Sequence, residues 1–509
     1  MNHVPTLDEP PGQFHSRWPE WAALGLYAGL VAFAIPYHEP SADVAQAWQL
    51  ARSLSLPALF ETYIRYEGSP GLWHFLLWLL IRAHLSYAGL SWICGAIAVG
   101  ATALLLFKSP FPSYLKLALP FTFFLVFQYA IAARSYVLVP ILLYLIALRW
   151  KKSPLVLALL LGLLANVALH AAVISAGLAL VYLIEQLQNR GALNPRRRRQ
   201  FWWAGLLLLS FWTFALWTAW PPRDLTDYLS FRLHSSLFSS FARSLASLVL
   251  PVFQPWVLSI PFWVAIALCL RARRRLFYLL PVLFLAAFCG AVASDWWHFG
   301  LMVPLAISLS WMTWPDSGLT PTRRESAGRM ALAAVACLQI FWSAYAIEFD
   351  HYHAYSPDLA TAGFLRPFVQ RGSTIAITDL HDPVAHAGAF FSVGVLPYFE
   401  RGIFVNQQEP FWSWSDQNPT EEGFLKALPL HPAVVVVGVY GTSPDAPSVL
   451  SHPRIQMLNR AGYRMTNVFC GAMPEGFRLM NHNCDLIFQR IDGTQQDSGK
   501  EANRSSGAK

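Results

Sequence analysis

The feature that most constrains the fold is a series of long apolar runs separated by short polar segments. Hydrophobic residues make up 55% of the 509-residue chain, and several runs approach the length that crosses a bilayer, roughly 20 residues. The net charge of +8 comes from basic clusters between these runs. This distribution is typical of a polytopic membrane protein and argues against a nucleic-acid partner. The apolar runs lie at 21–37, 91–107, 117–133, 135–149, 154–168, 171–185, 201–219, 249–269, 276–293, 298–314 and 329–348.

The run at 70–84 differs from the others, because His74 and Arg82 interrupt its apolar residues. We predict a helix that lies at the membrane surface without crossing. With a cytoplasmic N-terminus, eleven spans then place seventeen Lys and Arg residues in the inside loops and seven in the outside loops, as the positive-inside rule requires. The inside set is Lys108, Lys116, Arg149, Lys151, Lys152, Arg190, Arg196, Arg197, Arg198, Arg199, Arg271, Arg273, Arg274, Arg275, Arg323, Arg324 and Arg329. The outside set is Arg52, Arg65, Arg82, Arg134, Arg223, Arg232 and Arg243.

The charge pattern therefore divides the chain into four parts. We predict a cytoplasmic N-terminus at 1–20 and a transmembrane domain at 21–350, whose first external loop is 38–90. An α/β domain at 351–492 follows on the outer side, in the periplasm of a bacterium. The polar tail at 493–509 has the composition of a disordered segment.

The C-terminal part has the alternation of strands and helices expected of a small α/β domain. Cys470 and Cys484 lie in its last third and can form a disulfide if the domain faces an oxidising compartment, although spacing alone does not fix a pairing. The predicted strands are 373–380, 433–440, 464–469 and 484–489, and the predicted helices are 359–370 and 421–428.

The first external loop carries the carboxylate best suited to chemistry, Asp43. Ser41 is a predicted N-cap, so Asp43 falls in the first turn of a helix with an apolar stripe. The helix dipole favours the ionised carboxylate there, which suits Asp43 to accept a proton or to hold a cation. A first-turn carboxylate also stabilises a helix without any catalytic role, so both interpretations remain open.

Other polar residues fall in the same set of external loops. Glu67 precedes a Gly-Ser-Pro turn, where it either binds a sugar hydroxyl or pairs with Arg65. Arg134 lies between two apolar runs, where a guanidinium either reaches the headgroups or binds phosphate. His170 is an isolated histidine of the kind that is more often structural than a ligand. His298 ends an Asp-Trp-Trp-His turn, whose aromatic rings either stack on a sugar or line the bilayer surface.

Four short motifs resemble one family in their order and topology. They are D-V-A-Q-A-W-Q-L-A-R-S from Asp43, Y-E-G-S-P-G-L-W from Tyr66, K-S-P-F-P from Lys108 and Y-A-I-A-A-R-S-Y-V-L from Tyr129. This series is similar to bacterial membrane proteins of the glycosyltransferase C superfamily, in the branch of protein mannosyltransferases and the lipid A aminoarabinose transferase. The resemblance covers most of residues 20–440, including I-T-D-L-H-D-P-V-A in the external domain.

The resemblance implies roles for particular residues. An acidic residue of the first external loop, which activates the acceptor or serves metal binding in this superfamily, maps onto Asp43. Arg134 matches the external basic residues that bind the donor phosphate. Ser69 stands where relatives often have His in an E-G-H-P turn. The Asp-Glu pair that is usual in the first loop is reduced here to Asp43 followed by Val44. The predicted catalytic residue is Asp43, and the predicted substrate-binding residues are Glu39, Glu67, Arg134, His170 and His298.

The fold expected from this resemblance is mainly α, with about eleven transmembrane helices and a C-terminal periplasmic α/β domain. The expected function is an inverting glycosyltransferase of the bacterial inner membrane. It moves a sugar from a polyprenyl-phosphate donor to a lipid, glycan or protein acceptor, with no cofactor beyond a divalent metal ion that the superfamily sometimes uses. Two alternatives remain: a transporter or flippase of a lipid-linked glycan, and a non-catalytic relative that acts as an assembly partner.

Overall fold

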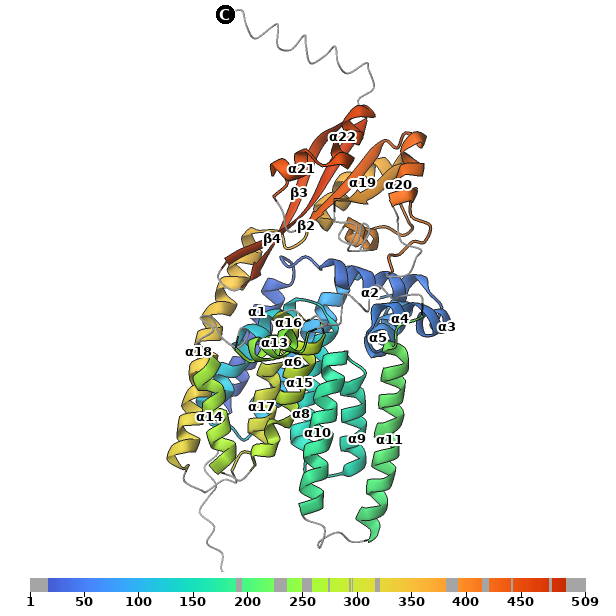
Figure 1. Cartoon of the computed structure of the whole chain (residues 1–509). Coiled ribbons are helices and arrows are strands. Elements are labelled where there is room, and N and C mark those ends of the chain that lie inside the picture. The colour runs from blue at the N-terminus through green and yellow to red at the C-terminus, as the bar shows by residue number, and fades with distance from the viewer. Residues whose placement is uncertain are drawn as a thin grey trace, which may run out of the picture.

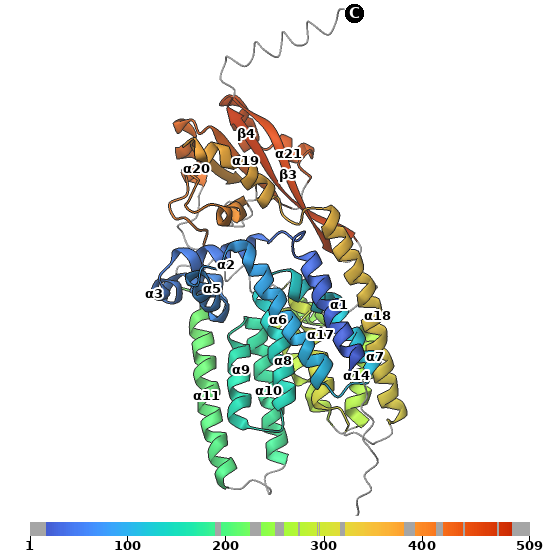
Figure 2. The same ribbon diagram turned by 180° about the vertical axis from the view of Figure 1, so that it is seen from behind.

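The protein consists of a helical bundle and a C-terminal sheet domain. The computed structural model describes residues 17–188, 195–223, 236–249, 259–272, 275–292, 294, 296–315, 321–380, 392–413, 421–440, 443–475 and 478–490. Most of the predicted N-terminal segment, residues 250–258 of one predicted span and the predicted tail lie outside this range. The bundle forms one end of the molecule and the sheet domain the other, with the helices of the first loop between them (Figures 1 and 2).

Four helices of the described part of the chain are long and apolar enough to cross a membrane, or five if a pair bent by 42° is one span. The long helix α18 runs along the bundle and leads into the sheet domain (Figure 1). The spans are α6 (Tyr87–Lys108), α10 (Leu169–Gln188), α11 (Pro195–Ala219) and α18 (Arg323–Tyr352), and the bent pair is Ser113–Phe121, which begins with α7 (Ser113–Ala118), and Phe124–Ile131.

Shorter apolar helices occupy the other predicted runs. A 12-residue helix such as α9 rises only about 18 Å, less than the ~30 Å hydrocarbon layer. Every predicted run thus contains helix, whereas length and composition support only four or five of the eleven spans. These helices are α1 (Trp18–Ala34), α8 (Leu138–Arg149), α9 (Pro154–Ala165), α14 (Ser259–Ala272), α15 (Leu280–Ala291), α16 (Trp296–Phe299) and α17 (Met302–Met312). A further apolar helix, α13 (Leu237–Val249), was not predicted and lies almost entirely before the run at 249–269.

The first loop folds into a layer of short helices over one end of the bundle (Figures 1 and 2). Helix α5, which covers the interrupted run, lies against α2 over its length. At its C-terminal end Arg82 donates hydrogen bonds to the carbonyl oxygens of Ala51 (2.8 Å) and Leu54 (3.1 Å), at the C-terminal end of α2. The C-terminal end of α5 therefore stays beside α2, while the N–H of Leu72 at its other end donates to the carbonyl oxygen of Asn166 at 3.1 Å. The helices are α2 (Ala42–Ser53), α3 (Leu56–Ala58), α4 (Ile64–Glu67) and α5 (Leu72–Arg82).

The C-terminal domain is a four-stranded sheet with strand order β1-β2-β4-β3, in which β1 and β2 are parallel and the other neighbours antiparallel. All predicted strands and helices are confirmed, although β3 and β4 are longer than expected. The short helices α21 and α22 were not predicted. The elements are β1 (Ile375–Asp379), β2 (Val434–Tyr440), β3 (Tyr463–Glu475), β4 (Arg478–Arg490), α19 (Asp358–Gln370), α20 (Glu421–Ala427), α21 (Pro447–Leu450) and α22 (Pro453–Arg460).

Helices cover both faces of this sheet, which explains the unbroken valine run of β2. Val434 and Val436 pack with residues of α19 on one face. Val435 and Val437 pack with α20 and α22 on the other face. A strand buried on both faces is apolar at every position instead of alternating with polar residues.

A disulfide joins Cys470 and Cys484, a pairing that the sequence left open. The two residues are directly opposite each other on β3 and β4. Their Cα atoms are 4.1 Å apart, and the sulfur atoms are bonded. The pairing register of the hairpin therefore brings these cysteines together.

Candidate functional site

Helix α2 presents two functional faces, one to a polar cavity and one to the C-terminal domain. Asp43, Gln46 and Ala47 share the cavity face, since residues three and four apart lie on the same side of a helix. Ser41 is the N-cap residue, as predicted, with an extended backbone (φ −75°, ψ 168°). Its hydroxyl does not cap the helix but accepts a hydrogen bond from Arg134 Nη2 at 3.0 Å.

The C-terminal domain holds α2 from the opposite side. Ala42 is part of the hydrophobic cluster under the sheet. The backbone N–H of Trp412 donates to Gln49 Oε1 at 3.1 Å, and Arg52 Nη1 donates to the carbonyl oxygen of Phe399 at 2.8 Å. The orientation of the helix that carries Asp43 therefore depends on contacts with the C-terminal domain.

Asp43 and Arg134, 91 residues apart in the sequence, form an ion pair at the centre of the site. Asp43 Oδ2 lies 3.0 Å from Arg134 Nη2. The Asp43 side chain is 51% exposed, whereas that of Arg134 is 9% exposed. Within the described part of the chain, the second oxygen, Asp43 Oδ1, has no hydrogen-bond partner. One carboxylate oxygen is thus held by the guanidinium and the other is open to the cavity.

The Arg134 guanidinium is fixed by stacking as well as by charge. Its Cζ lies 4.8 Å from the centroid of the Trp297 ring, within the range of a cation–π contact. Trp297, in α16, is held in turn by Tyr129, whose hydroxyl donates to the Trp297 carbonyl oxygen at 2.8 Å. A planar guanidinium stacked on an indole and bonded to an oxygen at its edge has little freedom to rotate.

These residues line a polar cavity of about 230 Å³. Four of the six predicted site residues meet there: Asp43, Glu67, Arg134 and His298. They come from α2, the end of α4, the turn before α8 and α16, so only the fold brings them together. The cavity is also lined by Val44, Gln46, Ala47, Ser69, Trp73, His74, Ala133, Ser135, Tyr136 and Trp297.

His170 and Arg65 make contacts outside the cavity. His170 does not line it but lies behind His298, with the rings stacked at 4.1 Å and Nε2 hydrogen-bonded to Ser294 Oγ at 2.9 Å. This arrangement agrees with the structural interpretation of His170. Arg65, considered as a partner of Glu67, instead donates from Nε to the Trp220 carbonyl oxygen at 3.2 Å.

Glu39 lies away from the cavity, beneath the C-terminal domain. The pKa of Glu39 is raised to about 7, chiefly by burial and also by the nearby charge of Asp350, while a hydrogen bond with the backbone of Leu359 acts in the opposite direction. Asp350 also contacts His38 at 2.8 Å. Burial and the neighbouring Asp485 likewise raise the pKa of Asp358. This geometry assigns Glu39 to the contact between loop and domain, and not to the substrate-binding residues with which it was predicted.

His74 and Gln46 belong to the cavity but were not predicted as site residues. Each is buried, and His74 Nδ1 and Gln46 Nε2 have no hydrogen-bond partner among the described residues. In the sequence His74 only interrupts an apolar run, and Gln46 is an ordinary helix residue. The one available signal is that Gln46 follows Asp43 by three positions and so shares its face of the helix.

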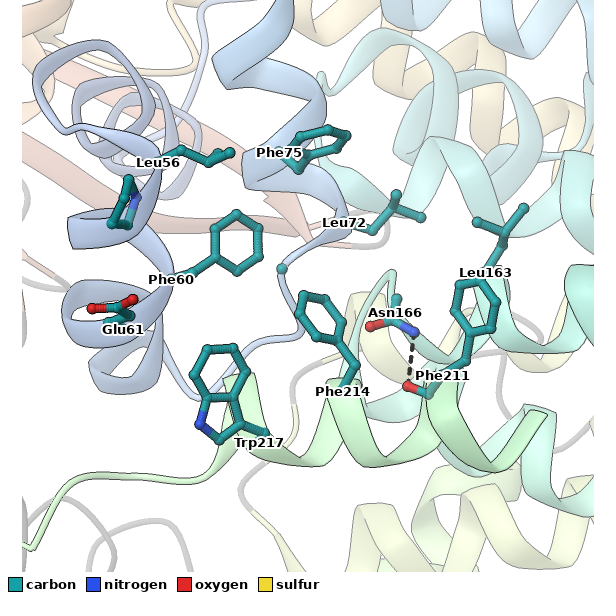
Figure 3. Close-up of a pocket in the computed structure, with 12 residues that line it drawn as sticks. Leu56, Phe60, Glu61, Leu72, Phe75, Leu163, Asn166, Phe211, Phe214 and Trp217 are labelled. Carbon is teal, nitrogen blue, oxygen red and sulfur yellow. Dashed lines mark hydrogen bonds between the residues drawn. The ribbon is translucent and has the colours of Figure 1, made fainter. Parts of the chain in front are cut away.

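A larger and almost entirely apolar cavity lies beside the polar one. It has a volume of about 500 Å³, and its side chains come from α3 and the turn that follows it, α5, α9 and α11 (Figure 3). Asn166 Nδ2 donates to the Phe211 carbonyl oxygen at 3.1 Å at its edge. The wall residues are Leu56, Pro57, Phe60, Glu61, Gly71, Leu72, Phe75, Leu163, Asn166, Phe211, Phe214 and Trp217.

The segment 69–75 separates the two cavities. Ser69, Trp73 and His74 face the polar cavity, whereas Gly71, Leu72 and Phe75 face the apolar one. Among the described residues, no group of three or more His, Cys, Asp or Glu side chains is arranged to hold a metal ion. The polar side offers a carboxylate that can accept a proton and a guanidinium that can bind an anion.

Comparison of the chain with protein-family models, curated proteins and solved structures finds no match. The function is therefore inferred from the geometry of the site and from the sequence motifs.

Proposed function

We propose that the protein is a membrane glycosyltransferase that uses a polyprenyl-phosphate sugar as its donor. The observation that carries this proposal is the common wall of the two cavities at residues 69–75. A lipid-linked sugar has a long apolar chain, a phosphate and a polar ring in that order. An apolar cavity of about 500 Å³ beside a polar one with an arginine and a carboxylate matches that order.

In the proposed reaction Asp43 acts as the general base and Arg134 binds the donor phosphate. Asp43 Oδ1 takes the proton of the acceptor hydroxyl, and the acceptor oxygen bonds to the anomeric carbon. The bond from that carbon to the phosphate oxygen breaks, and the phosphate leaves with the electron pair. Attack opposite the leaving group inverts the configuration. Arg134 stabilises the charge that develops on the phosphate, in a cavity where burial strengthens electrostatic interactions.

The proposal includes a topology with eleven spans in a bacterial inner membrane, in which the site and the C-terminal domain lie outside. It is supported by the excess of Lys and Arg in the predicted inside loops. A reporter that is active only outside the cytoplasm should be active when fused after Tyr352 and silent when fused after Arg199. The opposite pair of results would show that the segment 70–84 crosses the membrane.

A transporter of a lipid-linked glycan is the second candidate. Transporter sites lie between paired broken helices near the middle of the membrane. The described part of the chain contains one bent pair, Ser113–Phe121 with Phe124–Ile131, whereas the polar cavity lies at the end of the bundle. The geometry therefore favours the transferase, and a non-catalytic assembly partner would have no use for the open oxygen of Asp43.

Comparison of the lipids of a deletion strain with those of the parent strain tests the function directly. Loss of a transferase should leave its donor unused, so one polyprenyl-phosphate sugar should accumulate and one glycan modification should disappear. An unchanged set of polyprenyl-phosphate sugars would contradict the proposal. Accumulation of a lipid-linked glycan only on the cytoplasmic face would favour the transporter.

A further inference from the structure

Two buried polar side chains on neighbouring walls of the polar cavity each have an atom without a hydrogen-bond partner in the described part of the chain. His74, on α5, and Gln46, on α2, are each 6% exposed. Neither His74 Nδ1 nor Gln46 Nε2 has a hydrogen-bond partner among the described residues. Buried polar groups are nearly always hydrogen-bonded, because leaving one unsatisfied costs free energy. Two such groups on the walls of one cavity are therefore arranged for a ligand.

The chemical character of these groups restricts the ligand. Burial lowers the pKa of His74 to about 4, so its imidazole is neutral near pH 7 and offers one donor and one acceptor. The Gln46 amide also offers both. A phosphate oxygen only accepts and an ammonium group only donates, whereas a hydroxyl does both. The atoms without a partner are Gln46 Nε2, which only donates, and His74 Nδ1, which donates or accepts according to the tautomer. A hydroxyl group can accept from Gln46 Nε2 and can bond to His74 Nδ1 in either tautomer, which neither a phosphate oxygen nor an ammonium group can do.

The position of the pair separates it from the charged part of the site. Asp43 and Gln46 are one helical turn apart on α2, and Arg134 lies at the Asp43 end. An anionic group held by Arg134 leaves the Gln46 and His74 walls for the neutral part of the same molecule. Trp73 precedes His74 on α5 and adds an aromatic wall to the cavity.

We propose that His74 and Gln46 form the subsite that recognises ring hydroxyl groups of the transferred sugar. This inference depends on the proposed transferase function and names its specificity-determining residues. They are positioned to select which sugar is bound, because loss of a hydroxyl from the sugar would again leave a buried group without a partner.

Binding measurements on the purified full-length protein test this subsite. The probes are short-chain prenyl phosphates, one without a sugar and a panel carrying single hexoses or pentoses. The sugar-bearing probe that binds the parent protein most tightly is then used for the variants. We expect His74→Leu and Gln46→Met to lower the affinity for the sugar-bearing probe by about tenfold. The bare prenyl phosphate should bind to both variants as it binds to the parent. His74→Asn, which places an amide near the position of Nδ1, should recover most of the loss.

The possible outcomes separate the subsite from the function itself. If the parent protein binds none of the prenyl phosphates, the proposed donor class is wrong. If it binds them but the variants reduce the affinity for the bare and the sugar-bearing probe equally, the proposed subsite is wrong. It is also wrong if the variants change the affinity for neither probe. Variants are compared only after thermal unfolding shows that they fold like the parent.

Discussion

Asp43→Asn should lower sugar transfer by about a hundredfold to ten-thousandfold, the usual contribution of a positioned general base. The substitution keeps the shape of the side chain and an oxygen that can face Arg134, but it removes the negative charge and the basicity of Oδ1. The fold should survive, because a partly exposed charge in the first turn of a helix contributes only about 0.3–1 kcal/mol. The measurement is transfer by purified protein, or rescue of a deletion strain, at matched expression.

Glu348→Gln is the matched control for this change. It removes the same charge from an exposed position near the end of α18 and should leave transfer unaltered. Should Asp43→Asn transfer sugar as well as the parent, the carboxylate would serve only to start the helix and to pair with Arg134. The transporter and the non-catalytic partner would then be the stronger candidates.

The secondary structure of the C-terminal domain could be predicted because its signals are local. Four successive valines, in an apolar run that lies between Pro432 and Gly441, indicate a buried strand, whichever helices cover it. Helix α22 was missed because its sequence, Pro453–Arg460, has a low content of apolar residues. Its Ile455 and Leu458 become core residues only against β3 and β4. Strand pairing then aligned Cys470 with Cys484, which spacing in the sequence could only suggest.

The site could be predicted in part because its residues occupy the same set of loops. Glu39 and Asp43 are four residues apart, yet α2 begins between them and turns Asp43 toward the cavity. Glu39 stays in the preceding loop, against Asp350 and Asp358. The predicted N-cap at Ser41 already placed Asp43 on the helix and Glu39 before it, but the sequence does not show that Glu39 lies beneath the C-terminal domain. Nor does it reveal that His74 Nδ1 and Gln46 Nε2 have no hydrogen-bond partner among the residues described, because that depends on every neighbour the fold supplies.

Arg134→Met should reduce transfer by about a hundredfold to a thousandfold, the typical effect of removing one donor to a developing oxyanion. Arg134→Lys should lose less transfer activity than Arg134→Met, because lysine retains the positive charge. A lysine does not reproduce the planar contact with Trp297. The contacts with Asp43 Oδ2 and Ser41 Oγ both come from one nitrogen, Nη2, and a lysine nitrogen can supply a comparable pair. Arg65→Met is the control, since Arg65 contacts the Trp220 carbonyl outside the cavity. Equal activity of the Lys and Met variants would exclude a role for the charge.

The double variant Asp43→Asn with Arg134→Met decides whether the two residues act as one unit. Their side chains are 3.0 Å apart, and residues in direct contact seldom have additive effects. When Arg134 is removed, Asp43 also loses the group that orients it. Part of the activity lost in Arg134→Met is therefore the activity that is also lost in Asp43→Asn. We therefore expect the double variant to be only slightly less active than the worse single variant, as found for catalytic residues that act together. Losses that multiply fully would mean that the ion pair does not position the base, and that Arg134 acts on the phosphate independently of Asp43.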